Sequence, residues 1–196
     1  MLGSRSIIPK IPRAKEIEEK LGFSLQLRGP IIIKIGRSPF ARAMTYALAA
    51  IVVIGILWAI RSYNKALEID PTNINIWNNK GNAWFNLKRY EEAITCYNKA
   101  LEIDTHYANA LYNKGEALDN LGRYHEAITY LNKAIEMNAD YLSRVNYLKK
   151  RSYEHLFRKG ITHASTKDYE EAIECFDEAL KIEPEYKDAI KERASY

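Results

Sequence analysis

Apolar and small residues recur at helical spacing through the last two thirds of the chain. Trp77, Gly81 and Trp84 lie four and three residues apart, which places them on one face of an α-helix. A second stripe has the same spacing and consists of Tyr90, Ala93, Ile94, Tyr97, Ala100 and Leu101. The pattern predicts two amphipathic helices joined by a short connection at residues 86–89.

This pattern is repeated. The phrase Tyr-x-Glu-Ala-Ile begins at Tyr90, Tyr124 and Tyr169, and in each copy a glycine precedes the alanine at the same interval. The offset from the second copy to the third exceeds the offset from the first to the second by eleven positions. One helical pair cannot bury both of its apolar faces, so we expect the copies to stack. We also expect small residues where helix backbones approach closely, with Gly81 facing Ala93.

Eleven additional residues, Leu142 to Ser152, separate the second and third copies. Eleven residues make almost three helical turns, so they lengthen a helix by roughly 16 Å while its apolar face stays nearly in phase. We therefore predict one long helix over residues 141–164. Its exposed side carries Arg144, Lys149, Lys150, Arg151, Arg158 and Lys159. That side is either a solvated face or a docking patch for an acidic protein or an anionic lipid.

The repeats resemble tetratricopeptide repeats over about residues 63–196. The matching positions are Trp77, Gly81, Tyr90, Ala93, Tyr97 and Ala100 in the first unit, Leu111, Gly115, Tyr124, Ala127 and Ala134 in the second, and Leu156, Gly160, Tyr169, Ala172, Phe176, Ala179 and Pro184 in the third. The chain departs from the family pattern at Thr105 and Ala139, where proline is usual, and at Lys80, Lys114 and Lys159, where leucine is usual. The resemblance implies an all-α fold, namely an α-solenoid of stacked helical hairpins (a TPR superhelix). The uncharged apolar run ahead of it predicts an N-terminal hydrophobic helix.

We expect eight segments along the chain. They are a basic arm (1–42), a hydrophobic helix (43–60), a half repeat (61–73), a first repeat (74–107), a second repeat (108–141), the helical insertion (142–152), a third repeat (153–186) and a polar capping helix (187–196).

The hydrophobic helix admits several interpretations. The segment from Ala43 to Ile60 carries no charge and lies between Arg42 and Arg61, and a helix of that length spans roughly 27 Å against a bilayer core of about 30 Å. Eight of its residues are Leu, Ile or Val, which favours membrane insertion by about 2 to 5 kcal/mol. The alternatives are a buried degenerate repeat in a soluble protein and an error at the start of the gene model. We favour a single membrane span in a helix that continues to about Ile69.

Charge is unevenly distributed. Residues 1–42 carry nine Lys or Arg and three acidic residues, whereas residues 61–196 carry 20 and 22. The arm could contain a helix over residues 11–21 and a hairpin over residues 24–35, and its charge suits anionic headgroups. The basic arm favours a cytoplasmic N-terminus and the expected reduced thiols favour cytoplasmic repeats, so the sidedness stays open. Without a membrane span, the protein would be cytoplasmic.

The sequence contains no recognisable catalytic or metal-binding pattern. Cys96 and Cys175 fall at equivalent places in two non-adjacent repeats, too far apart for a disulfide, so both are expected to be free thiols. The four histidines form no close ligand pair with a cysteine. The chain has no phosphate-binding loop, and its near-neutral repeats do not suggest nucleic-acid binding. We expect no enzyme activity, no cofactor and no metal site.

The resemblance places a partner-binding groove on the first helices of the repeats. The groove residues it implies are Asn75, Asn78, Asn79, Asn82, Phe85 and Asn86, then Asn109, Tyr112, Asn113, Glu116 and Asn120, and finally Glu154, Phe157, Arg158 and Ile161. Amide side chains both donate and accept hydrogen bonds, which suits an extended peptide. Some relatives clamp a C-terminal carboxylate with two asparagines and three basic residues. Asn82, Asn113 and Arg158 match that arrangement, but Asn78 and Glu154 replace lysines, which argues against a strong clamp.

The leading hypothesis is a scaffold that binds a peptide or protein in this groove and is tethered to a membrane through residues 43–60. The alternatives are a soluble adaptor with a degenerate first repeat, and a module that binds anionic lipid or nucleic acid through the basic arm and the insertion. The identity of the partner and self-association into a homo-oligomer are left open.

Overall fold

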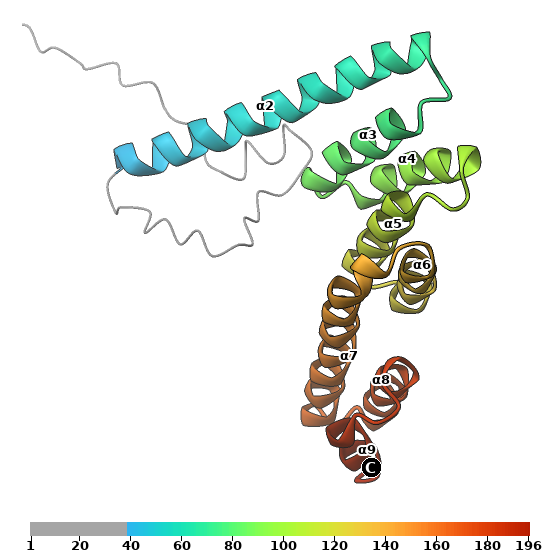
Figure 1. The fold of residues 1–196 in the computed structure, drawn as a ribbon. Coiled ribbons are helices and arrows are strands. Elements are labelled where there is room, and N and C mark those ends of the chain that lie inside the picture. The colour runs from blue at the N-terminus through green and yellow to red at the C-terminus, as the bar shows by residue number, and fades with distance from the viewer. Residues whose placement is uncertain (1–38) are drawn as a thin grey trace, which may run out of the picture. The chain divides into compact units, whose positions relative to one another are not determined.

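The structure, a computed structural model, describes the backbone of residues 39–196 and the side chains of residues 43–196. The predictions for the basic arm up to residue 38 lie outside the described residues. Within the described range every regular element is a helix, which confirms the all-α prediction (Figure 1). The elements are α2 (Pro39–Ile69), α3 (Ile74–Asn86), α4 (Tyr90–Ile103), α5 (Ala108–Asn120), α6 (Tyr124–Met137), the short η1 (Ala139–Tyr141), α7 (Leu142–Ser165), α8 (Tyr169–Ile182) and α9 (Lys187–Arg193).

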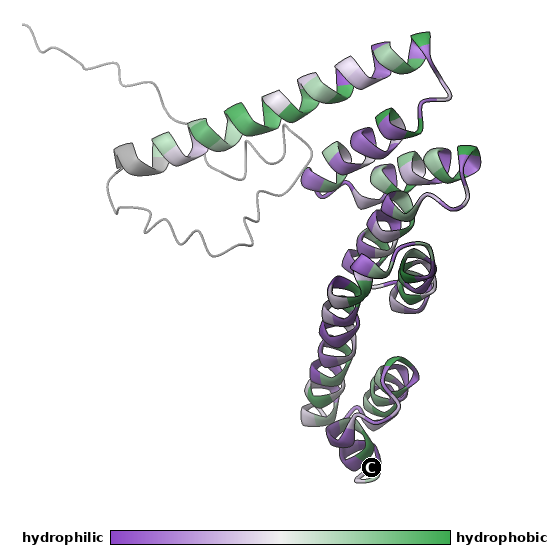
Figure 2. Ribbon diagram, in the orientation of Figure 1, coloured by the Kyte–Doolittle hydropathy of each residue, from purple (hydrophilic) through white to green (hydrophobic). Residues whose placement is uncertain are grey.

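Helix α2 contains the apolar segment. It begins at Pro39, ahead of the expected start at Ala43, because proline is well tolerated in the first helical turn. It then continues without a break to Ile69, and its middle is strongly hydrophobic (Figure 2). Its large apolar side chains are mostly exposed, namely Leu48, Ile51, Val52, Ile54, Leu57 and Trp58. The stretch Ala43–Ile69 is long and apolar enough to cross a membrane, by length and composition alone.

The chain divides into two compact units after Arg61. The second unit, Ser62–Tyr196, is built from helical hairpins: α3 packs on α4, α5 on α6, and α7 on α8. Successive hairpins are joined by packing of α4 on α5, and α8 is followed by α9 (Figure 1). Fully buried alanines lie where these helices meet, including Ala93, Ala100, Ala110 and Ala127. The expected stack of hairpins is therefore present in the second unit.

Three glycines allow the hairpins to close around a large side chain of the following helix. A Cβ atom added to Gly160 would lie 2.5 Å from Cε1 of Phe176, and one added to Gly115 would lie 2.6 Å from Cγ of Leu131. At Gly81 an added Cβ would overlap the ring of Tyr97. The three atoms nearest to this added Cβ all belong to the Tyr97 ring, which the prediction did not place against Gly81. The glycine is needed because the buried ring occupies the space that a side chain would take.

The long helix predicted after the second repeat is present as α7. It covers 24 residues. The prediction started this helix at Tyr141, but residues 139–141 form the separate η1. Val145 and Leu148 are buried and cluster with Leu131 of α6. Further along the helix, Gly160 packs on Phe176 of α8. Helix α7 therefore uses its first half to cover the second repeat and its second half to build the third.

Candidate functional site

An asparagine network links the first two repeats. The Nδ2 atom of Asn113 on α5 donates hydrogen bonds to Oδ1 of Asn78 and to Oδ1 of Asn82 on α3, at 3.0 Å each. Asn82 also accepts a hydrogen bond from the Tyr97 hydroxyl at 2.8 Å. Side chains from three helices thus hold one another in place. Such mutual bonding fixes the orientation of the amides that line the adjoining cavity.

The cavity beside this network has a volume of about 490 Å³. Its lining residues are Asn82, Phe85, Asn86, Tyr97, Tyr112, Asn113, Glu116 and Arg144. They come from α3, α4, α5 and α7. Six of them were predicted as groove residues, so the expected asparagine and aromatic side chains do meet at one cavity.

The lining is mainly uncharged, with one carboxylate and one guanidinium. Burial raises the pKa of Glu116, while Arg151 and Arg144 oppose that shift. Burial, with a smaller contribution from Glu116, raises the pKa of Tyr112 to about 12. Tyr112 therefore stays a neutral hydroxyl at physiological pH. The cavity offers amide donors and acceptors, a hydroxyl and two opposite charges, a set that can bind the backbone and polar side chains of a peptide.

Several predicted residues have structural roles beside the cavity. Asn78 was predicted to face the groove, but it is only 5% exposed and accepts a hydrogen bond from Asn113. Asn75 accepts a hydrogen bond from the Tyr107 hydroxyl at 2.9 Å. Asn109 accepts one from the Tyr141 hydroxyl. Each of these two asparagines therefore fixes a tyrosine that precedes the next repeat.

The groove residues predicted in the third repeat do not reach this cavity. Phe157 packs on Phe176, with ring centroids 5.7 Å apart, and on Tyr186, at 5.2 Å, so it belongs to the core around α8. Arg158 and Ile161 are exposed on α7. The insertion moves the third repeat along α7 and away from the first two.

Two predicted residues of the first two repeats also lie outside the cavity. Asn79 and Asn120 are exposed, and neither belongs to the lining. Asn120 donates a hydrogen bond to the Glu116 carbonyl in its own helix at 2.8 Å. Its amide therefore serves the end of α5 rather than the cavity.

Two lining residues were not among the predicted groove residues. Tyr97 was interpreted only as a packing residue, although its hydroxyl reaches Asn82. Arg144 belongs to the insertion and lies over the ring of Tyr112, with its Cζ 5.8 Å from the centroid. No repeat position corresponds to Arg144, so family spacing could not indicate it. Helical phase from Val145 and Leu148 places it beside the buried stripe, and that signal was available.

The basic positions of a carboxylate clamp are altered as the sequence indicated. Glu154 lies between Lys150 and Arg158, with an N–O separation of 3.8 Å to each. Its negative charge neutralises part of the positive charge that a carboxylate ligand would need. Asn78 and Glu154 both stand where a clamp has lysines, and Asn78 is also buried. The cavity therefore lacks the cluster of cations that binds the carboxylate of a chain terminus.

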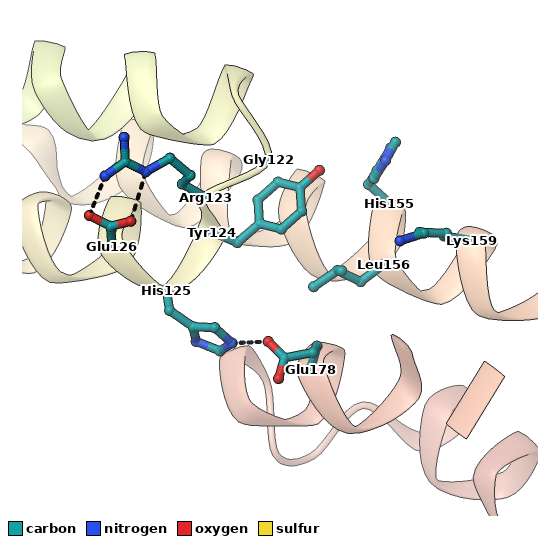
Figure 3. A pocket seen from close by; sticks show the side chains of 9 residues that line it. All are labelled: Gly122, Arg123, Tyr124, His125, Glu126, His155, Leu156, Lys159 and Glu178. Atoms are coloured by element: carbon teal, nitrogen blue, oxygen red, sulfur yellow. Dashed lines mark hydrogen bonds and ion pairs between the residues drawn. The ribbon is translucent and has the colours of Figure 1, made fainter. Parts of the chain in front are cut away.

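A second cavity, of about 470 Å³, lies among the start of α6, helix α7 and helix α8. Figure 3 shows Tyr124, Leu156 and Lys159 around it. A hydrogen bond joins the imidazole of His125 of α6 to the carboxylate of Glu178 of α8. None of the predicted groove residues lines this cavity. It lies where the insertion separates the second repeat from the third.

The described residues contain no group of three or more His, Cys, Asp or Glu side chains that could hold a metal ion. Cys96 and Cys175 are both free and buried. Burial raises the pKa of each thiol, so both thiols are protonated at neutral pH and react poorly as nucleophiles.

Comparisons with known proteins agree with the repeat pattern. Two family models, both described as tetratricopeptide repeat, match residues 72–140 and residues 153–186. The insertion falls between these two matches. No curated protein matches the chain.

Several solved structures are similar. Two crystal structures of MamA are 26% identical with a TM-score of 0.40; each covers 66% of this chain, which spans 70% and 65% of those chains. A complex of the TPR2B domain of yeast Sti1 with pHsp70 is 20% identical with a TM-score of 0.49, and the match covers 58% of this chain and 95% of that chain.

Proposed function

Since the chain belongs to the tetratricopeptide repeat family, we propose that it is a non-enzymatic scaffold that binds an extended polypeptide in the cavity between its first two repeats. The observation that carries this proposal is the pre-ordered asparagine network. Asn82 and Asn113 are held by bonds to each other and to Tyr97. A ligand that meets fixed donors and acceptors loses less entropy in binding than one that must order them.

The chemistry of the lining supports a polypeptide ligand rather than a substrate to be transformed. An extended peptide presents alternating N–H and C=O groups, and amide side chains complement both. Phe85 and Tyr112 add aromatic surface for a side chain of the ligand. The lining residues include no Ser, Thr, Cys, His or Lys side chain, and for this reason we propose a binding role alone.

We further propose that the repeats are tethered to a membrane by α2. The helix exposes most of its aliphatic side chains over a stretch long enough to span a bilayer. A terminal repeat of a soluble solenoid would need a polar outer face, and α2 lacks one between Ala49 and Leu57. These features support a single-pass membrane protein over a soluble adaptor with a degenerate first repeat.

The groove proposal predicts the effect of replacing both cavity asparagines. The double variant Asn82→Ala plus Asn113→Ala is compared with wild type in a quantitative pulldown. We expect the amount of each retained polypeptide to fall by about tenfold or more, because each lost hydrogen bond contributes about 0.5–1.5 kcal/mol. Circular dichroism should show an unchanged helical content.

The matched control removes two asparagines at corresponding positions of the second helices, Asn98→Ala plus Asn132→Ala. It should leave the retained polypeptides unchanged, because these residues do not line the cavity. Equal loss in both variants, or an unchanged set of partners in the cavity variant, would contradict the groove.

A further inference from the structure

The insertion is attached to the second repeat by one face only. Val145 and Leu148 pack against Leu131 of α6. At the end of the insertion, the buried carboxylate of Asp119 on α5 accepts a hydrogen bond from Ser152 and pairs with Arg151. These contacts fix the rotation of α7 about its own axis, so the directions of its exposed side chains are fixed as well.

The exposed side of the insertion is cationic and aromatic. Arg144, Tyr147 and Lys150 follow one another at three-residue intervals, so they form one stripe on the helix, which begins at Arg144 beside the buried residues and turns away from them toward Lys150. Tyr147 is 67% exposed. Arg158, two turns beyond Lys150, is also exposed. We call these four residues the α7 stripe.

The positive charge of the α7 stripe is only partly balanced. Lys150 and Arg158 share a single carboxylate, that of Glu154, at 3.8 Å each. Arg144 lies over the Tyr112 ring, and in residues 43–196 it forms no ion pair with a carboxylate. Glu116 lies near enough to Arg144 for that guanidinium to lower its pKa. Three cations thus face two carboxylates, those of Glu154 and the partly buried Glu116, and one positive charge remains in excess.

The net positive charge of the repeats is concentrated in α7. Residues 142–165 carry six Lys or Arg and one Glu, so their net charge is +5. Residues 61–141 carry nine basic and eleven acidic residues, a net charge of −2, and residues 166–196 carry five and ten, a net charge of −5. A long polyanion such as RNA would meet repulsion from the acidic segments on both sides of α7. A short acidic segment would meet only the α7 stripe.

The α7 stripe is continuous with the cavity, because Arg144 belongs to both. We propose that the α7 stripe binds an internal acidic segment of the polypeptide that occupies the cavity, an inference that rests on the proposed function. Arg144 and Arg158 would pair with Asp or Glu side chains, for which guanidinium is the best-matched cation. From Arg144 to Arg158 the helix rises about 21 Å, which an extended segment of six or seven residues spans.

This mode of recognition differs from a clamp on a chain terminus. The cations of the α7 stripe are spread along three to four helical turns, instead of converging on one point. Two of the stripe's cations, Arg144 and Lys150, belong to the insertion, which the family repeat does not contain. The acidic residues of the ligand should therefore be internal, with no requirement for a free C-terminus.

The test uses the full chain in detergent micelles and a display library of random dodecapeptides flanked on both sides by constant sequence. Wild type should select peptides enriched in Asp and Glu. The variant Arg144→Ala plus Lys150→Ala should still select peptides, but without acidic enrichment. Its affinity for an acidic peptide selected by wild type should fall about three- to thirtyfold, as expected for two exposed ion pairs. The control variant Lys99→Ala plus Lys133→Ala removes the same charge from α4 and α6 and should behave like wild type.

Each other outcome overturns a defined claim. Selected peptides without acidic enrichment, or enrichment that survives in the Arg144 and Lys150 variant, would refute the α7 stripe while leaving the groove intact. Selection of no peptide by any of the proteins would refute the groove itself. A third outcome is that wild type selects no acidic peptide but binds a short single-stranded RNA or phosphatidylserine-containing mixed micelles, and that the same variant loses this binding. It would assign the α7 stripe to a different ligand.

Discussion

Replacing Phe176 by alanine is expected to lower the free energy of unfolding of the repeat unit by about 3–5 kcal/mol, because a fully buried aromatic side chain is lost and a cavity remains. Phe176 lies between Gly160 and Phe157 of α7, so its ring holds α8 against the long helix. The measurement is denaturant unfolding followed by circular dichroism at the helical minimum. Replacing the exposed Tyr147 by alanine, as a control, should change stability by less than about 0.5 kcal/mol.

The same contact can be tested from the glycine side. Gly160→Ala should destabilise the unit by about 1–3 kcal/mol, because its methyl group overlaps the Phe176 ring. In a Phe176→Ala background the added methyl should cost little, since the ring that it would overlap is absent. Additive effects of the two changes would contradict the close approach of α7 and α8.

Two arginines in α2 should release the protein from membranes. Wild type is expected in the pellet after carbonate extraction. The variant Ile51→Arg plus Ile54→Arg should move to the supernatant, because two central arginines cost about 5–7 kcal/mol. That penalty is larger than the gain of about 2 to 5 kcal/mol expected from the aliphatic residues.

Both isoleucines are 64% exposed, so in a soluble protein the arginines would be tolerated without any change in fractionation. The conservative variant Ile51→Leu plus Ile54→Leu should stay in the pellet. Extraction of wild type itself by carbonate would contradict the tether.

The sequence predicted the architecture well because the repeats place the same small residues at the same spacing three times. Helical phase alone sufficed to predict that the insertion lengthens one helix, since its length keeps Val145, Leu148, Ser152 and Leu156 on a common side. The neighbour of Gly81 was not predictable in this way. Spacing along each helix shows which residues share a face, but the depth of a ring such as Tyr97 depends on the distance between the two helices.

The candidate site was predicted less completely than the fold. Repeat positions predicted Asn82 and Asn113 as groove residues, but they did not predict that Asn78 would be buried and bonded to Asn113. Two amides on a shared surface can either bond to each other or stay open to a ligand, and the sequence does not decide between them. Arg144 lies outside the repeat pattern, so only the packing of α7 brings it to the cavity.

The most direct test of the central claim, that the cavity holds a polypeptide, is site-specific photo-crosslinking in living cells. A photoreactive amino acid at Asn86, which lines the cavity and is exposed, should form covalent adducts with a polypeptide. The Asn82→Ala plus Asn113→Ala changes should lower the yield of these adducts by about tenfold or more. The same amino acid at Asn132, on the exposed side of α6, should give none. Adducts that are equal at both positions, or that persist without the two asparagines, would contradict the account.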